Sequence, residues 1–166
     1  MSISTLLLPE FDQEMKVTRL TIERVPSKPD FVPHAKSMPM GKLAAHLAQL
    51  TGFGFIILTT PELDFSKTSI PQQPFESAGQ LAKALDEGAT RTRSALASLP
   101  DSAWTEPWKL SFQGKTIFEG ERFLAYREMF INHVVHHRAQ LGVYLRLNDV
   151  PLPATYGPSA DDRRGF

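Results

Sequence analysis

The 166-residue chain contains no cysteine and has no net charge, because 18 lysine and arginine residues balance 18 aspartate and glutamate residues. The lack of cysteine excludes disulfide bonds, thiolate metal ligands and a cysteine nucleophile. Balanced charge without a basic stripe argues against nucleic acid or an anionic membrane as a partner. No uninterrupted apolar run approaches the roughly 20 residues that cross a bilayer. We therefore expect a cytoplasmic protein that binds neither membrane nor nucleic acid.

Several catalytic motifs are also missing from the sequence. The chain has no GxSxG nucleophile elbow, no P-loop, no GxGxxG fingerprint and no HExxH metalloprotease motif. The first nine residues are apolar in part, but no basic residue precedes the apolar stretch, so we interpret them as a helix start rather than a signal peptide. Any chemistry must therefore come from a less common arrangement of residues.

Apolar residues recur at steps of three and four along most of the chain, a pattern typical of amphipathic helices. This periodicity predicts four long helices, at about residues 4–25, 39–59, 76–99 and 119–148. Pro9 suits the first helix only if it lies in the first turn. Gly52 and Gly54 weaken the second helix, which often indicates close approach by a neighbouring element.

The helices are joined by irregular segments. Residues 60–75 are rich in proline and polar residues, and residues 104–118 predict a short strand or hairpin around Gln113-Gly114. The C-terminal tail is expected to lie over the bundle surface. The sequence therefore predicts one all-α domain over residues 1–166, a four-helix bundle with a long irregular connector before the last helix.

Three of the five histidines lie in the segment 132–138 of the last predicted helix. Residues four apart on a helix have Cβ atoms roughly 5–6 Å apart, so His133 and His137 can aim their rings at one point, as chelating pairs do. The spacing also allows His133 to pair with His136. On a helical wheel, however, His137 falls in an apolar sector and His136 falls beside Asn132, so the apolar context favours His133 with His137.

Two imidazoles on an apolar face need partners, because a buried unpaired polar group costs about 1–3 kcal/mol. Either a metal ion or hydrogen bonds inside the bundle would supply them, and spacing alone leaves both open. His46 is the best third candidate because it shares a helical face with Leu43 and Leu50, although a lone inward histidine is more often a core residue. His34 lies in a proline-bounded loop and is expected at the surface. An all-imidazole site favours zinc, nickel or iron over magnesium or calcium.

Segments over most of the chain resemble the DinB family of metal-dependent enzymes. They are residues 33–38 leading into 41–47, residues 133–141, and residues 150–159. Ala139 replaces the glycine usual in the family's HHRGQ element, a change that concerns packing more than ligation. The resemblance implies a bundle with up-down-down-up topology, often dimeric, with a divalent metal, frequently nickel or zinc, on His46, His133 and His137.

The resemblance also implies similarity to transferases and isomerases that use low-molecular-weight thiols. We therefore expect a metal-dependent transferase or hydrolase with a small-molecule substrate, in which Tyr126, Tyr144 or Arg138 either orients the substrate or only packs or forms an ion pair. Spacing identifies no general base, because Glu128 lies off the histidine face. The alternative is a non-catalytic homodimeric bundle that binds a metal or a ligand. It is favoured by a second apolar sector on the last helix, formed by Leu124, Ile131, Val135 and Leu145.

Overall fold

The computed structural model describes residues 2–68, 70 and 73–163. Four long helical stretches make up most of this part of the chain. The first three are α1 (Ile3–Ile22), α2 (Met40–Thr59) and α3 (Ala78–Ser98). The fourth is built from α4 (Arg122–Leu124), the π-helical segment η2 (Ala125–Ile131) and α5 (Asn132–Arg146), which follow one another without a break.

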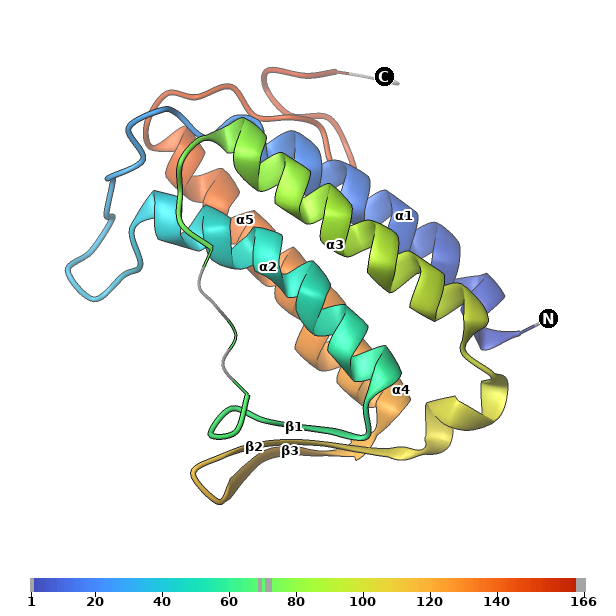
Figure 1. Ribbon diagram of the computed structural model, residues 1–166. Helices are drawn as coiled ribbons and strands as arrows, with labels where there is room; N and C mark the ends of the chain where they lie inside the picture. The colour runs from blue at the N-terminus through green and yellow to red at the C-terminus, as the bar shows by residue number, and fades with distance from the viewer. Residues whose placement is uncertain (1, 69, 71–72, 164–166) are drawn as a thin grey trace.

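The helices form a bundle with an up-down-down-up topology (Figure 1). Helix α1 runs in one direction, α2 and α3 both run in the opposite direction, and α5 returns alongside α1. Two parallel neighbours need a long crossover, which the segment between α2 and α3 provides. Helices α1 and α2 each contact both α3 and α5, so α1 and α2 lie diagonally opposite each other in the bundle.

The ends of α1 and α3 follow from local capping. Ser2 and Ser77 occupy the N-cap positions, and their hydroxyls accept hydrogen bonds from the backbone N–H groups of Thr5 and Gln80. The expectation for Pro9 was wrong, because this residue lies inside α1 beyond its first turn. Pro9 and Thr5 are both exposed, so water can satisfy the carbonyl that the missing proline N–H leaves free.

A small sheet at one end of the bundle makes the purely all-α prediction incomplete. Its strands β1 (Glu62–Asp64), β2 (Pro107–Phe112) and β3 (Lys115–Glu121) lie in the order β1-β2-β3. The pair β1–β2 is parallel and β2–β3 is antiparallel. The hairpin predicted around Gln113-Gly114 is present, and both turn residues have positive φ angles of 50° and 75°, as a tight hairpin turn requires.

The last helix begins at Arg122 rather than at residue 119. Residues 119–121 instead extend β3 and pair with residues 107–109 of β2. The Arg122 side chain is buried and donates hydrogen bonds to the carbonyls of Ile57 (2.5 Å) and Thr60 (2.7 Å) at the end of α2, and to that of Ala103 (3.1 Å). One guanidinium group therefore satisfies terminal carbonyls of α2 and ties the helix end to the sheet region.

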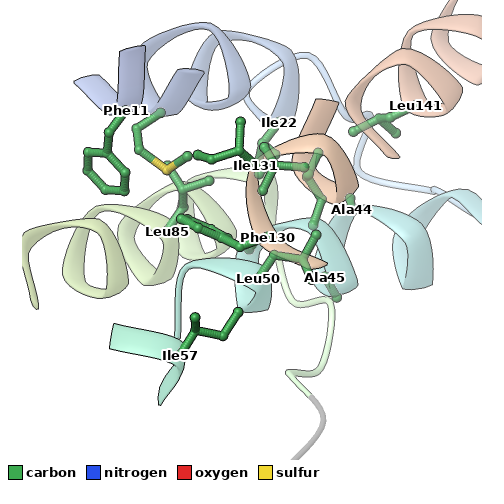
Figure 2. Packing of buried hydrophobic residues seen from close by; sticks show 14 of the residues in the cluster. Phe11, Ile22, Ala44, Ala45, Leu50, Ile57, Leu85, Phe130, Ile131 and Leu141 are labelled. Atoms are coloured by element: carbon green, nitrogen blue, oxygen red, sulfur yellow. The ribbon is translucent and has the colours of Figure 1, made fainter. Parts of the chain in front are cut away.

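The core lies between the four helices and is filled by aliphatic and aromatic side chains (Figure 2). Phe11 of α1 and Leu85 of α3 lie there near Phe130 of η2. A Cβ atom on Gly54 would come within 2.7 Å of the Phe130 ring, so the close approach predicted at this glycine is confirmed. At Gly52 no described atom lies within 4 Å of such an atom, but a Cβ atom on Gly88 of α3 would lie 3.5 Å from the Gly52 nitrogen, so α3 does approach α2 here.

The apolar composition of α2 matches its burial inside the bundle. Over the described residues it is the one helix long and apolar enough, by composition, to cross a membrane. However, 67% of its most apolar window is buried inside the bundle, as in the core helix of a soluble protein.

Candidate metal centre

Two helices bring three histidines together inside the bundle. His46 lies near the middle of α2, and His133 and His137 lie one turn apart on α5. Helices α2 and α5 contact each other, so the single ring from α2 faces the pair from α5. All three side chains are partly buried. The structure therefore brings together the trio that the sequence and the resemblance single out.

The three rings approach through their Nε2 atoms. The Nε2 atom of His133 lies 2.8 Å from that of His137 and 3.4 Å from that of His46. One nitrogen from each ring falls within 4.8 Å of the others. This convergence of three nitrogen atoms is the geometry needed to hold one ion.

The other ring nitrogens of the α5 pair have oxygen partners. Nδ1 of His133 lies 3.3 Å from the carbonyl oxygen of Met129, and Nδ1 of His137 lies 2.7 Å from Oε1 of Gln140. A carbonyl or amide oxygen accepts but does not donate, so both Nδ1 atoms must carry the proton. Both Nε2 atoms then present lone pairs 2.8 Å apart, an arrangement that a cation between them stabilises.

Burial lowers the pKa of all three imidazoles below the usual value of 6.5. For His46 the pKa falls to about 4, because of burial first and then of the nearby His137 and His133. Burial also lowers the pKa values of His133 and His137. Their hydrogen bonds to Met129 and Gln140 act in the opposite direction and raise the pKa. The rings are therefore neutral near pH 7, which is the form that binds a metal ion.

The donor set fits a borderline transition-metal ion. Tetrahedral zinc with Zn–N bonds of roughly 2.0–2.1 Å separates its nitrogen ligands by about 3.3 Å, and the measured separations of 2.8 and 3.4 Å lie on either side of that value. Imidazoles without carboxylates suit zinc, nickel or iron better than magnesium or calcium. Within the described ranges, no fourth His, Asp or Glu joins the group. The three histidines could thus hold an ion with a free coordination position.

The remaining histidines lie outside this group. His34 is exposed, and its Nδ1 accepts a hydrogen bond from the backbone N–H of Lys36, as expected for a loop residue. His136 is also exposed, with its ring 4.9 Å from that of His137. Between the two pairings that spacing allowed, the structure therefore joins His133 to His137.

Arg138, Tyr126 and Tyr144 lie outside the histidine cluster, and each has another packing or ion-pair partner. Arg138 is only 4% exposed and forms a buried ion pair with Glu14 of α1, with Nη1 2.6 Å from Oε2. Tyr156 donates a hydrogen bond to the same carboxylate, at 2.8 Å to Oε1. This network anchors the C-terminal tail across α1 and α5, in line with the tail position expected from the sequence.

The tyrosines of the last helix are packing residues. Tyr126 is fully buried against Trp104 and Phe130, and burial raises the pKa of its phenol. Tyr144 packs edge-on against Phe31, with ring centroids 5.8 Å apart. For Tyr126, Tyr144 and Arg138, the packing or ion-pair interpretation therefore fits better than substrate orientation.

A cleft of about 1030 Å³ opens beside the histidine cluster, and His46 and His133 form part of its lining. Its other walls come from α2, α3, the sheet and the connector before α3. This cleft could not be predicted from the sequence, since its lining combines residues far apart in the chain. A molecule in the cleft would have direct access to the converging nitrogen atoms.

Comparisons with known proteins agree with this architecture. The chain matches the DinB family over residues 1–164. It is similar to a crystal structure of a DinB-like protein from Bacillus subtilis, with 15% identity and a TM-score of 0.68 over 96% of this chain and 99% of that one. A DinB-like protein from Bacillus cereus ATCC 10987 gives 18% identity and a TM-score of 0.66 over 90% and 95%. No curated protein matches the chain. With its bundle, its small sheet and a family match over nearly its whole length, this chain belongs to the DinB family.

Proposed function

We propose that the protein is a metal-dependent enzyme, a transferase or hydrolase, that holds one divalent ion on His46, His133 and His137. The observation that carries this proposal is the convergence of three Nε2 atoms beside an open cleft, with no fourth side-chain ligand from the described part of the chain. A closed set of four protein ligands is typical of structural sites, whereas three ligands and an open position are typical of catalytic ones. The arrangement therefore favours catalysis over a purely structural ion.

The residues around the cluster have distinct roles in this proposal. The three imidazoles hold the ion, and the Met129 carbonyl and the Gln140 amide fix the orientation and tautomer of His133 and His137. When bound, such an ion lowers the pKa of a coordinated water or thiol and so supplies a nucleophile near neutral pH. The cleft binds the small-molecule substrate next to the open position.

Nickel and zinc are the ions that we propose, with a low-molecular-weight thiol as a candidate co-substrate. The all-imidazole donor set supports the choice of ion. The resemblance to thiol-dependent transferases supports the thiol. Elemental analysis of protein produced without a histidine tag tests the ion directly, and one equivalent of nickel or zinc per chain is the expected result.

The histidine assignment is tested by single alanine variants. His46→Ala, His133→Ala and His137→Ala are each expected to abolish stoichiometric metal content. His136→Ala is the matched control, since it removes a neighbouring exposed imidazole outside the cluster. Unchanged metal content in the first three variants would refute the site. Thiol-transfer and hydrolysis assays on the loaded protein then test the reaction class.

We also propose that the protein forms a homodimer. Val143 and Leu147 on the outer side of the last helix are each 58% exposed, and Leu124 is 43% exposed. Exposed apolar side chains of this kind are more stable when a second copy covers them. Sedimentation equilibrium tests the proposal, and a monomer at micromolar concentration would refute it.

A further inference from the structure

The cleft beside the histidines does not end at the metal centre but continues across α2. Its lining includes Phe53 and Met129, and also Phe55 of α2 and Ala84 of α3. At about 100° per residue, Phe53 lies on the same face of α2 as His46 (the histidine side), whereas Phe55 lies on the opposite face (the far side). Gly52 lies in the lining between these two sides. The described part of the connector, which runs from β1 to α3 past α2 (Figure 1), contributes Phe65.

Gly52 is costly for α2, and no described side chain packs where its Cβ atom would lie. A glycine inside a helix destabilises it by an amount that alanine would recover. Gly54, two residues on, is required because Phe130 packs against it, but a Cβ atom on Gly52 would meet no atom of the described residues within 4 Å. Gly52 therefore keeps open space over the helix at the point where the cleft crosses it.

Apolar side chains form part of the wall on the histidine side of this crossing, beside the polar Gln49. The rings of Phe53 and Phe65 are nearly parallel, at an angle of 18° with centroids 6.5 Å apart, and Ile117 extends the apolar lining. On the far side, Glu87 and Arg91 also line the cleft but are exposed, so both charges remain hydrated at its rim. The cleft therefore suits a molecule with an apolar body.

We propose that the cleft binds an elongated acyl compound, with its carboxylate at the metal centre and its alkyl chain crossing α2 over Gly52. This inference rests on the proposed metal site for the carboxylate head, while the chain is placed by the apolar walls and the open crossing. Gly52 is then the residue that determines which chain lengths are accepted.

The distance along α2 sets the chain length at which Gly52 becomes important. Six residues separate His46 from Gly52, which corresponds to roughly 9 Å at 1.5 Å per residue. An extended alkyl chain advances about 1.25 Å per methylene, given carbon–carbon bonds of about 1.5 Å. A hexanoate chain therefore ends before Gly52, whereas a dodecanoate chain passes over it.

The test compares hexanoate and dodecanoate binding to zinc-loaded protein by calorimetry. Affinity is expected to rise roughly two- to fourfold per methylene, because each buried methylene adds to binding and the cleft is partly open. Gly52→Leu is expected to weaken dodecanoate binding by about four- to sixteenfold, the effect of two displaced methylenes, and to leave hexanoate binding unchanged. Gly52→Ala is the matched control and is expected to retain dodecanoate binding, since its added methyl group meets open space.

Dodecanol, which lacks the carboxylate, separates this inference from the metal proposal. If the metal assignment fails, fatty acids lose their advantage over the alcohol, but dodecanol binding still weakens in Gly52→Leu and the placement of the chain stands. If dodecanoate and dodecanol both bind Gly52→Leu as tightly as the wild type, or if affinity does not rise with chain length, the inference is overturned even where metal content is stoichiometric.

Discussion

Replacing Gln140 by alanine should weaken metal binding without touching any ligand. The Gln140 amide oxygen accepts the Nδ1 proton of His137 at 2.7 Å and so keeps the Nε2 lone pair directed at the cluster. Loss of such a partner typically lowers metal affinity by about 10- to 100-fold, or about 1.4–2.7 kcal/mol. Because Gln140 is exposed, water can replace part of the hydrogen bond. We therefore expect about a tenfold loss, the lower end of that range.

The assay is a competition between the protein and a chromophoric zinc chelator, with protein made without a histidine tag. Gln140→Glu is the matched control, because a carboxylate accepts the same proton and should hold affinity at or above the wild-type value. Far-ultraviolet circular dichroism checks that both variants fold. Equal affinities for the wild type and Gln140→Ala, or an equally weakened Gln140→Glu, would refute the role assigned to this amide.

Three further predictions concern stability. Glu14→Ala leaves the buried Arg138 unpaired and should lower the free energy of urea unfolding by about 3–5 kcal/mol; a loss below about 1 kcal/mol, typical of an exposed pair, would contradict the buried network. Gly52→Ala should raise the free energy of unfolding by about 0.5–1 kcal/mol, whereas Gly54→Ala should lower it by about 1–3 kcal/mol through overpacking against Phe130. Effects of the same sign in the two variants would contradict this prediction. In metal-free protein, His46 protonates near pH 6.5 when unfolded but near about 4 when folded. The free energy of unfolding of the wild type, taken relative to that of His46→Asn, should therefore fall as the pH is lowered from about 6.5 to about 4. A difference between the two proteins that does not change with pH in urea titrations would contradict this prediction.

The sequence could predict the long helices because their signal is local and repeated. Three- and four-residue spacing of apolar side chains places α1, α2 and α3 to within a few residues of their observed bounds. The same periodicity puts His46 on the inward face of α2 and sets His133 and His137 one turn apart. A chelating geometry of this kind depends on helix spacing, which is why the residues alone could indicate it.

The sheet could not be predicted in the same way, because it depends on pairing between distant segments. Strand β1 has three residues and lies in a connector without apolar periodicity, and its partner β2 begins more than 40 residues later. Glu119 and Glu121 favour helix by intrinsic propensity, but pairing with β2 overrides that preference. Tertiary contacts of this kind leave no trace in a local window.

The buried ion pair was missed for a related reason. Glu14 lies on α1 three residues after Phe11 and four before Thr18, both of which are buried. Its position on the inward stripe was therefore a usable signal, and the partner had to be a cation on another helix. Only the fold shows that Arg138, next to His137 of the histidine cluster, turns away to Glu14 and the tail.

The π-helical segment η2 explains why one helical wheel could not describe the whole last helix. A hydrogen bond to the fifth residue, as between the Asn132 N–H and the Arg127 carbonyl, adds a residue to the turn and shifts the phase of everything before it. Leu124 and Ile131 share a sector on a uniform wheel, yet Leu124 is 43% exposed and Ile131 is buried. The segment ends directly before α5, and its Met129 carbonyl accepts the Nδ1 proton of His133. The irregular turn thus supplies a partner that orients a ring of the histidine cluster, in keeping with the frequent occurrence of π-turns at functional sites.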